Sequence, residues 1–183
     1  MPEDQAAWLD QLRTGDEGAV RDMVRAYGGA LVRFLGGMTG NAADAEDLAQ
    51  EAFLRVVSHM SEFRGEASLK TYLFKIAHNL ALNHLSSARH RYEVLPDEMP
   101  DRPSPGPAPL QAASDEEEAR RLRDTLVHLP SQQRAVVMLR TWEDLSFKEI
   151  AQTMSLAEGT VKAHYFFALR NLRRMMEAPH DPR

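Results

Sequence analysis

Residues 145–174 read LSFKEIAQTMSLAEGTVKAHYFFALRNLRR, and this stretch predicts two short helices joined by a turn. Ser146 and Glu149 have the spacing of a capping box, in which each side chain bonds a backbone N–H at the start of a helix. Ser155 and Glu158 repeat that spacing, so we expect a second helix to be capped in the same way. The first helix has an apolar face made by Ile150, Ala151 and Met154. The stretch is therefore predicted to be a helix-turn-helix.

The second of these helices has two different faces. At about 100° per residue, one face carries Val161, Tyr165, Ala168, Leu172 and Met176. The other face is basic and aromatic, with Lys162, Phe166, Arg170, Arg173 and Arg174. A buried back and a cationic front suit the DNA major groove, where lysine and arginine neutralise phosphates and the first turns reach base edges. The alternative is an amphipathic helix whose charged face is only solvated.

The composition fits a globular protein of one or two small domains. Its 183 residues are 43% hydrophobic, which is enough for modest cores. No run of about 18 apolar residues predicts a membrane span, and the acidic start MPEDQ lacks the basic-then-apolar order of a signal peptide. A cytoplasmic protein is therefore expected. The absence of cysteine excludes disulfides and thiolate zinc sites in this chain.

The net charge of −5 is unevenly distributed along the chain. Residues 1–95 carry a net charge of −3, residues 96–118 carry −6, and residues 119–183 carry +4. Residues 92–114 are rich in proline and acid and have no helical period, so we predict an extended linker there. The basic end contains the predicted helix-turn-helix, so the overall acidity does not argue against nucleic-acid binding.

Residues 4–13 and 16–37 predict two scaffold helices, because their apolar side chains recur at spacings of three and four. Gly36, Gly37 and Gly40 then break the pattern, and the second helix is expected to end there. We assign no chemistry to either helix.

Asn41 is predicted to cap a helix over residues 42–60. Its broad inward arc is apolar and contains Ala45, Leu48, Ala49, Ala52, Phe53, Val56 and Met60. The opposite arc contains Asp44, Asp47, Gln50, Glu51 and Leu54. The helix dipole favours acids in the first turn, but it requires neither Glu51 two turns later nor a leucine within an acidic face. A solvated face and a docking site for a basic partner both remain open.

Residues 61–85 combine a turn at Gly65 with a helix that Ser68 is expected to cap and that buries Leu69, Leu73, Ile76, Ala77 and Leu80. The other residues are aromatic, cationic or amide-bearing: Phe63, Arg64, Lys70, Tyr72, Lys75, His78, Asn79 and Asn83. Such side chains suit a site for single-stranded nucleic acid, although both aromatic residues would equally fit a core. His78, His84 and His90 are six residues apart, not three or four, so we expect no metal site and no cofactor.

Four stretches together resemble a bacterial RNA polymerase sigma factor of the extracytoplasmic-function (ECF) group. They are DAEDLAQEAF, FRGEASLKTYLFKIAHNLALNHL, the acidic linker, and LPSQQRAVVMLRTWEDLSFKEIAQTMSLAEGTVK. The resemblance covers roughly residues 10–176 in the order of the family. It implies an all-α protein without enzymatic activity, in which an N-terminal helical domain (1–91) and a C-terminal helix-turn-helix domain (115–178) flank the linker.

The resemblance implies a role for three surfaces. The acidic face would bind the clamp helices of the largest polymerase subunit through Asp44, Asp47, Gln50, Glu51 and Leu54. The FRGEAS loop and its helix would capture the non-template strand of the minus-10 element through Phe63, Arg64, Gly65, Tyr72, Lys75 and Asn79. The last helix would read the minus-35 element through Thr160, Lys162, Ala163, Phe166, Phe167, Arg170, Arg173 and Arg174. The family also implies an anti-sigma protein as inhibitor.

Some features depart from the family or fit another one. Ala163 and Phe167 stand where relatives commonly carry serine and arginine, so either the target is read by methyl contacts and shape, or some aromatic residues of HYFFAL pack inside. GTVKAH also resembles the recognition helix of LuxR-type regulators, which would bind duplex DNA without polymerase, but such a regulator would not explain FRGEAS or the acidic face. A hydrolase is disfavoured because the chain has no nucleophile elbow, phosphate loop or paired-ligand spacing.

Overall fold

The computed structural model of the protein describes residues 5–94 and 125–177, and the regular elements in those ranges are all helical, as predicted. The N-terminal part contains α1 (Gln5–Arg13), α2 (Glu17–Thr39), α3 (Ala42–Ser58), the 3-10 turn η1 (Met60–Glu62) and α4 (Leu69–Val94). The C-terminal part contains α6 (Ser131–Thr141), α7 (Phe147–Met154) and α8 (Glu158–Glu177). Residues 92–94 of the expected linker belong to α4, and the rest of it lies outside the described residues.

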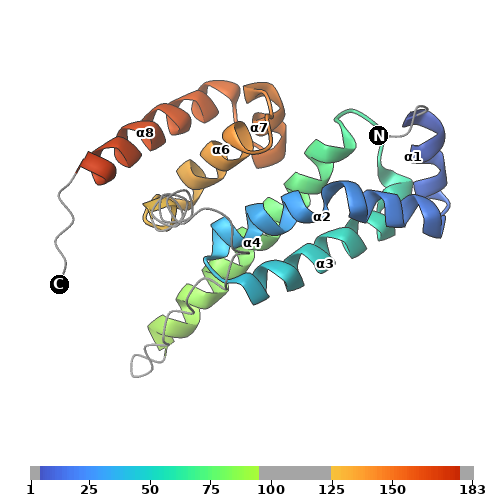
Figure 1. Ribbon diagram of the computed structural model, residues 1–183, viewed down its shortest axis with the longest axis horizontal. Coiled ribbons are helices and arrows are strands. Elements are labelled where there is room, and N and C mark those ends of the chain that lie inside the picture. The colour runs from blue at the N-terminus through green and yellow to red at the C-terminus, as the bar shows by residue number, and fades with distance from the viewer. Residues whose placement is uncertain (1–4, 95–124, 178–183) are drawn as a thin grey trace, which may run out of the picture.

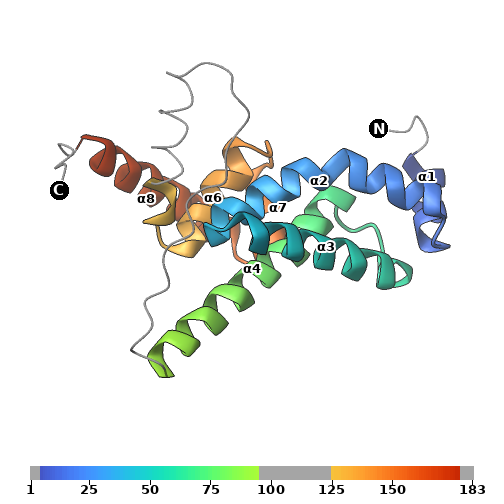
Figure 2. The same ribbon diagram turned by 60° about the horizontal axis from the view of Figure 1, so that its bottom comes forward.

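The N-terminal part is a bundle in which α2, α3 and α4 pack around one core, with α1 against one end of α2 (Figure 1). The inward arc predicted for α3 is confirmed, because all of its members are buried. The predicted caps also hold: Asn41 Oδ1 accepts from the backbone N–H of Ala43 at 2.9 Å, and Ser68 Oγ accepts from that of Thr71 at 3.0 Å. The C-terminal end of α4 projects beyond its neighbours (Figures 1 and 2).

The helix predicted over residues 16–37 ends two residues later than expected, and of the three glycines expected to break the pattern only Gly40 ends it. The helix runs through Gly36 and Gly37 to Thr39, and it ends at Gly40, whose φ of 73° is left-handed and whose N–H donates to the Gly36 carbonyl at 2.8 Å. A glycine inside a helix costs only about 1 kcal/mol, which packing outweighs here. A Cβ on Gly37 would overlap the side chain of Met138 in α6, so the missing side chain lets α6 approach.

In the C-terminal part, α7 and α8 form the predicted helix-turn-helix. The capping box at its start is confirmed: the Glu149 N–H donates to Ser146 Oγ at 3.2 Å, and the Ser146 N–H donates to Glu149 Oε2 at 2.8 Å. The second capping box is wrong, because Ser155 is the left-handed C-cap of α7 (φ 55°) and α8 begins only at Glu158. A residue in the left-handed conformation ends one helix and redirects the chain into the next. Ser155 therefore forms the turn between α7 and α8 and does not cap the start of α8.

The inward face of α8 is largely as predicted. Val161, Ala168 and Leu172 are buried, and Tyr165 is partly buried. The prediction that Met176 lies on the inward face is wrong, since its side chain is 61% exposed. Met175 packs against the core in its place.

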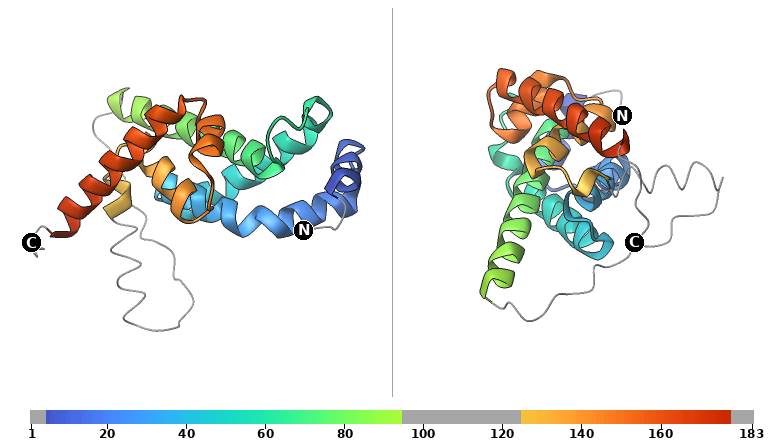
Figure 3. Two further views of the ribbon diagram at one scale, coloured as in Figure 1. Left: turned by 90° about the horizontal axis from the view of Figure 1, so that it is seen from above. Right: turned by 90° about the vertical axis from the view of Figure 1, so that its left-hand side faces the viewer.

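The two parts are packed together through helices of both. α6 lies against α2 and α7 lies against α4, as all views of the ribbon agree (Figures 1, 2 and 3). One cluster of buried apolar residues runs from the N-terminal bundle into α6, α7 and the first turn of α8. Among the described residues, none of the helices combines the length and the apolar character needed to cross a membrane.

Candidate nucleic-acid and partner surfaces

The acidic arc of α3 faces away from the bundle. Asp47, Gln50 and Leu54 are exposed, and Leu54 is 71% exposed although it is apolar. Glu51 is half-buried and bonds Arg55 one turn later, with 2.6 Å between Glu51 Oε1 and Arg55 Nη2. The helix therefore presents carboxylates around one solvent-facing leucine, as the sequence indicated.

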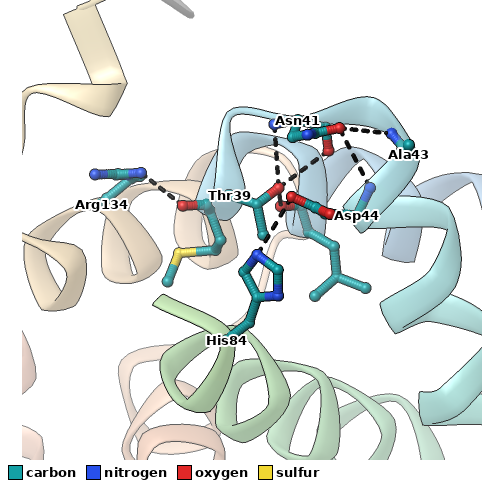
Figure 4. A network of polar contacts seen from close by, with 8 residues as sticks. Thr39, Asn41, Ala43, Asp44, His84 and Arg134 are labelled. Atoms are coloured by element: carbon teal, nitrogen blue, oxygen red, sulfur yellow. Dashed lines mark hydrogen bonds and ion pairs between the residues drawn. The ribbon is translucent and has the colours of Figure 1, made fainter. Parts of the chain in front are cut away.

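Asp44 belongs to the edge of this arc rather than to its centre. Its Oδ2 lies 3.2 Å from Nε2 of His84 in α4, and its backbone N–H donates to Asn41 Oδ1 at 3.3 Å (Figure 4). Thr39 completes the corner, since its hydroxyl lies 3.1 Å from the Asn41 carbonyl oxygen and accepts from the Asn41 N–H at 3.2 Å. The Asp44–His84 pair connects the first turn of α3 to α4, and the Thr39–Asn41 bonds connect it to the end of α2. These bonds hold the exposed arc in place.

A second surface is a groove of about 460 Å³ between the loop before α4 and the first turns of α4. Its wall is made by Glu62, Phe63, Arg64, Glu66, Ala67, Thr71, Tyr72 and Lys75, together with Gln152 and Ser155 from α7. The structure thus brings four of the six residues predicted for the minus-10 element to one groove. Gly65 lies in the loop beside them, with a left-handed φ of 73°.

The groove is lined by two aromatic rings and by charged side chains of both signs, with Arg64 and Lys75 as the cations and Glu62 and Glu66 as the acids. The rings of Phe63 and Tyr72 lie 5.0 Å apart at 37°, and Phe63 is buried while Tyr72 is partly exposed. Burial, with a smaller contribution from Glu62, raises the pKa of Tyr72, which keeps its hydroxyl protonated as a hydrogen-bond donor. Arg64 and Lys75 are exposed. An aromatic ring can stack a base, and an exposed cation beside it can hold the phosphate.

Two further residues of α4 differ in accessibility. Asn79 does not line the groove but is exposed, two turns beyond Tyr72 on the same side of the helix. His78, which the sequence grouped with these polar residues, is instead 1% exposed. Neither of its ring nitrogens meets hydrogen-bond geometry with a partner among the described residues, and burial, only partly offset by the Asn79 side chain, lowers its pKa to about 4. His78 is therefore a neutral core residue.

The third surface is the outer face of α8, where all eight residues predicted for the minus-35 element are exposed. Lys162 pairs with Glu158 at 2.7 Å and Arg173 with Glu177 at 2.7 Å, whereas Arg170 makes no ion pair within the described residues.

The structure divides the aromatic residues of this helix into two groups. Tyr165 packs inward on Phe147, with 5.5 Å between ring centroids. Phe166 and Phe167 point outward, 63% and 47% exposed, and stack edge to face on each other. The outward pair offers apolar surface of the kind that contacts thymine methyl groups.

Sequence reasoning missed two residues that line the groove and one buried ion pair between the two parts of the chain. Gln152 and Ser155 line the groove from α7, and the buried Glu143 pairs with Lys70 of α4, with 3.1 Å between Oε2 and Nζ. Lys70 and Glu143 are 73 positions apart, and no local pattern signals such a pairing. A buried glutamate is unusual in itself, but only the fold identifies its partner.

Comparison with known protein families gives two matches, one to the N-terminal part of the chain and one to the C-terminal part. The model of sigma-70 region 2 matches residues 23–91, and that of sigma-70 region 4 matches residues 119–172. The first range contains the acidic face and most of the groove, and the second contains the helix-turn-helix.

Curated proteins of the same kind match over nearly the whole chain. RNA polymerase sigma-H factor of Pseudomonas aeruginosa is 31% identical, with 92% of each chain covered. ECF RNA polymerase sigma factor SigL of Mycobacterium tuberculosis is 31% identical, with 86% of this chain and 89% of SigL covered.

Solved structures share the fold. CnrH, solved in complex with the cytosolic domain of CnrY, gives a TM-score of 0.70 at 21% identity, covering 95% of this chain and 97% of CnrH. The sigma factor RpoE of Bartonella quintana, solved with the anti-sigma factor NepR, gives a TM-score of 0.74 at 19% identity. The match covers 87% of this chain and 98% of RpoE.

Proposed function

The chain belongs to the extracytoplasmic-function group of RNA polymerase sigma factors, and we propose that its three surfaces share the work of promoter recognition. A protein of this group directs core RNA polymerase to specific promoters at initiation. Its work is binding and DNA opening, so we assign no residue a catalytic role. The proposal divides the chain into an N-terminal domain (1–91), a linker (92–114) and a C-terminal domain (115–178).

The acidic arc of α3 is proposed to bind the clamp helices of the largest polymerase subunit. Exposed Asp47 and Gln50 beside the exposed Leu54 support this role, because a fully solvated face gains nothing from an apolar residue. Charge complementarity steers a basic partner to the arc, and Leu54 supplies apolar area. Asp44 and Glu51, each already in a bond within the chain, are assigned the edge of the contact.

The groove is proposed to hold bases of the non-template strand at the minus-10 element. The groove that places the Phe63 and Tyr72 rings beside the exposed cations Arg64 and Lys75 is the observation that carries the proposal. Unstacking a base costs a few kcal/mol, and stacking on Tyr72 with a phosphate contact at Lys75 offsets that cost. Asn79 would meet the strand just beyond the groove through its amide. The strand is thereby captured as it separates.

The outer face of α8 is proposed to enter the major groove at the minus-35 element. Thr160, Lys162 and Ala163 lie in its first turns, which reach base edges in helix-turn-helix proteins. Phe166 and Phe167 favour contact with thymine methyl groups, and Arg170 neutralises a phosphate. A duplex-binding regulator alone would leave the region 2 match at residues 23–91 without a role.

An anti-sigma protein is proposed to restrain the chain. The solved relative RpoE was crystallised with an anti-sigma factor, and CnrH with the cytosolic domain of a second protein, which supports a partner of this kind here.

Run-off transcription with purified core polymerase tests the proposal directly. Core enzyme plus this protein, on fragments of the source genome, should give discrete transcripts that core enzyme alone does not. Permanganate footprinting of the same templates should reveal unpaired thymines upstream of each start. Absence of specific transcripts across the whole set of fragments would reject the proposed activity.

A further inference from the structure

The centre of the outer face of α8 is apolar. Ala163, Phe166 and Phe167 stand at positions i, i+3 and i+4, so they are neighbours on one side of the helix. All three are exposed, and the two phenylalanine rings pack edge to face, with 5.7 Å between their centroids and 74° between their planes. None of the three side chains can donate or accept a hydrogen bond. We call these residues the apolar patch.

Cations border the apolar patch. Arg170 lies one turn beyond it and Arg174 one turn further, and neither makes an ion pair with another described residue. Lys162 lies on the other side of the patch, paired with Glu158 at 2.7 Å. The whole of α8 carries four basic and two acidic residues, which gives it a net charge of +2. An anionic occupant fits this surround, and double-stranded DNA also offers apolar groups on its base edges.

The spacing of these residues is that of a helix that reads the major groove. A homeodomain contacts bases through positions i, i+3, i+4 and i+7 of its third helix. Ala163, Phe166, Phe167 and Arg170 have the same spacing, and at about 100° per residue they cover about 100° of the helix surface. The opposite face of α8 packs against α6 and α7 (Figure 1), which leaves the patch exposed.

The major groove presents one apolar group on a base edge, the C5-methyl group of thymine. The other groups there are hydrogen-bond donors or acceptors, and the apolar patch would remove their water without replacing its hydrogen bonds, which costs free energy. Cytosine has only a hydrogen at C5, whereas 5-methylcytosine carries the methyl group of thymine at the same place on the ring. The patch therefore favours a pyrimidine that is methylated at C5.

We propose that the apolar patch recognises the C5-methyl group of pyrimidines, in thymine and equally in 5-methylcytosine, and that this contact sets the base preference of α8. The inference rests on the proposed entry of α8 into the major groove, and it names the chemical group that is read there. It has a regulatory consequence. Methylation of a cytosine at C5 within the bound element strengthens binding, so modification of the DNA alters the affinity of the protein for its site.

Selection from a randomised duplex pool by the full chain, alone and with core polymerase, provides the DNA for the test. The enriched duplex is synthesised with deoxyuridine in place of each thymine in turn, which removes one methyl group and changes nothing else. It is also synthesised with cytosine or 5-methylcytosine at each of these positions. At a position that the patch contacts, we expect deoxyuridine to weaken binding about fourfold, and 5-methylcytosine to bind about fourfold more tightly than cytosine.

Two variants assign this preference to the patch. Phe166→Ala combined with Phe167→Ala removes both rings from the surface, so the double variant should bind the thymine and deoxyuridine duplexes with equal affinity. Met176→Ala is the matched control, because its side chain is 61% exposed, against 63% for Phe166, but lies in the last turn of α8. It should keep the wild-type preference. Circular dichroism confirms that each variant is helical.

The outcomes separate this inference from the proposed function. Equal affinity of the wild-type chain for thymine and deoxyuridine at every position would overturn the inference, even where run-off transcription succeeds. A preference that persists in the double variant would come from DNA shape and would also overturn it. Failure to enrich any duplex would overturn it and leave the patch to a protein partner. Methyl-dependent binding without run-off transcripts would reject the proposed promoter activity and leave the inference standing.

Discussion

At the residue scale, His78 is the side chain whose environment is least suited to its charged form. Its folded pKa of about 4 lies below the usual 6.5, so the unfolded chain binds the proton more readily between these values. We therefore expect His78 to cost no stability above about pH 6.5. As the pH drops to about 4, the free energy of unfolding should fall by about 3 kcal/mol, because the unfolded chain gains a proton that the folded chain does not.

Urea unfolding between pH 4 and 7.5 measures this effect. The control is His78→Leu, which fills the buried site with a side chain that does not titrate and should flatten this part of the profile. The same pH dependence in both proteins would assign it to other groups.

Tyr72 in the groove and Asn79 just beyond it together test the proposed contact with the non-template strand. Replacing both by alanine should remove the stacking surface and the amide, and thus reduce strand opening by about tenfold or more, since stacking contributes about 1–3 kcal/mol per base. Permanganate reactivity at the minus-10 element measures opening, and duplex binding of the polymerase complex should change little. Tyr72→Phe, which keeps the ring beside Phe63, should remain active. Normal permanganate reactivity in the double variant would remove these residues from the site.

At the element scale, α8 separates its packing face from its binding face, and its cations differ in what they already contact. Arg170 makes no ion pair within the described residues, whereas Lys162 pairs with Glu158. We expect Arg170→Ala to reduce the slope of log affinity against log salt concentration by about one, and Lys162→Ala to reduce it by less. Arg21→Ala, an exposed change on α2, is the control. A salt slope unaffected by Arg170→Ala would place that residue off the interface.

The turns of the helix-turn-helix show what an element can and cannot reveal by itself. Ser146 and Glu149 form the capping box that their spacing predicts, because both ends of each bond lie within one helical turn. Ser155 and Glu158 have identical spacing but do not form a capping box. The angle between α7 and α8 demands a left-handed residue at Ser155, and that angle is set by packing on the rest of the molecule.

At the scale of the whole molecule, the acidic arc of α3 lies apart from the groove lining and can be altered without touching it. We expect Asp47→Lys combined with Glu51→Lys to abolish binding to core polymerase, because two of the three carboxylates on the arc are replaced by cations. The double variant should keep its helical circular dichroism and cooperative melting, since neither residue is in the core. Co-purification with core enzyme at the wild-type level would contradict the docking role. The exposed pair Asp22→Lys and Glu17→Lys on α2 is the matched control.

The local features of this protein were determined by its sequence. Apolar spacing defined the helices, Asn41, Ser68 and Ser146 capped them, and the exposed faces of α3 and α8 followed from helical geometry. These features depend on residues within one or two helical turns of each other. The interactions that stabilise them can therefore be predicted from side chains that are close in the sequence.

Tertiary structure alone decided the rest. The burial of His78 and Glu143, the passage of α2 through Gly36 and Gly37, and the presence of α7 at the groove all depend on contacts between distant parts of the chain. Such contacts form only when the apolar area buried by several helices together outweighs the cost of placing glycine in a helix or a charge in the interior. That balance is a property of the assembled fold, and no single stretch of sequence contains it.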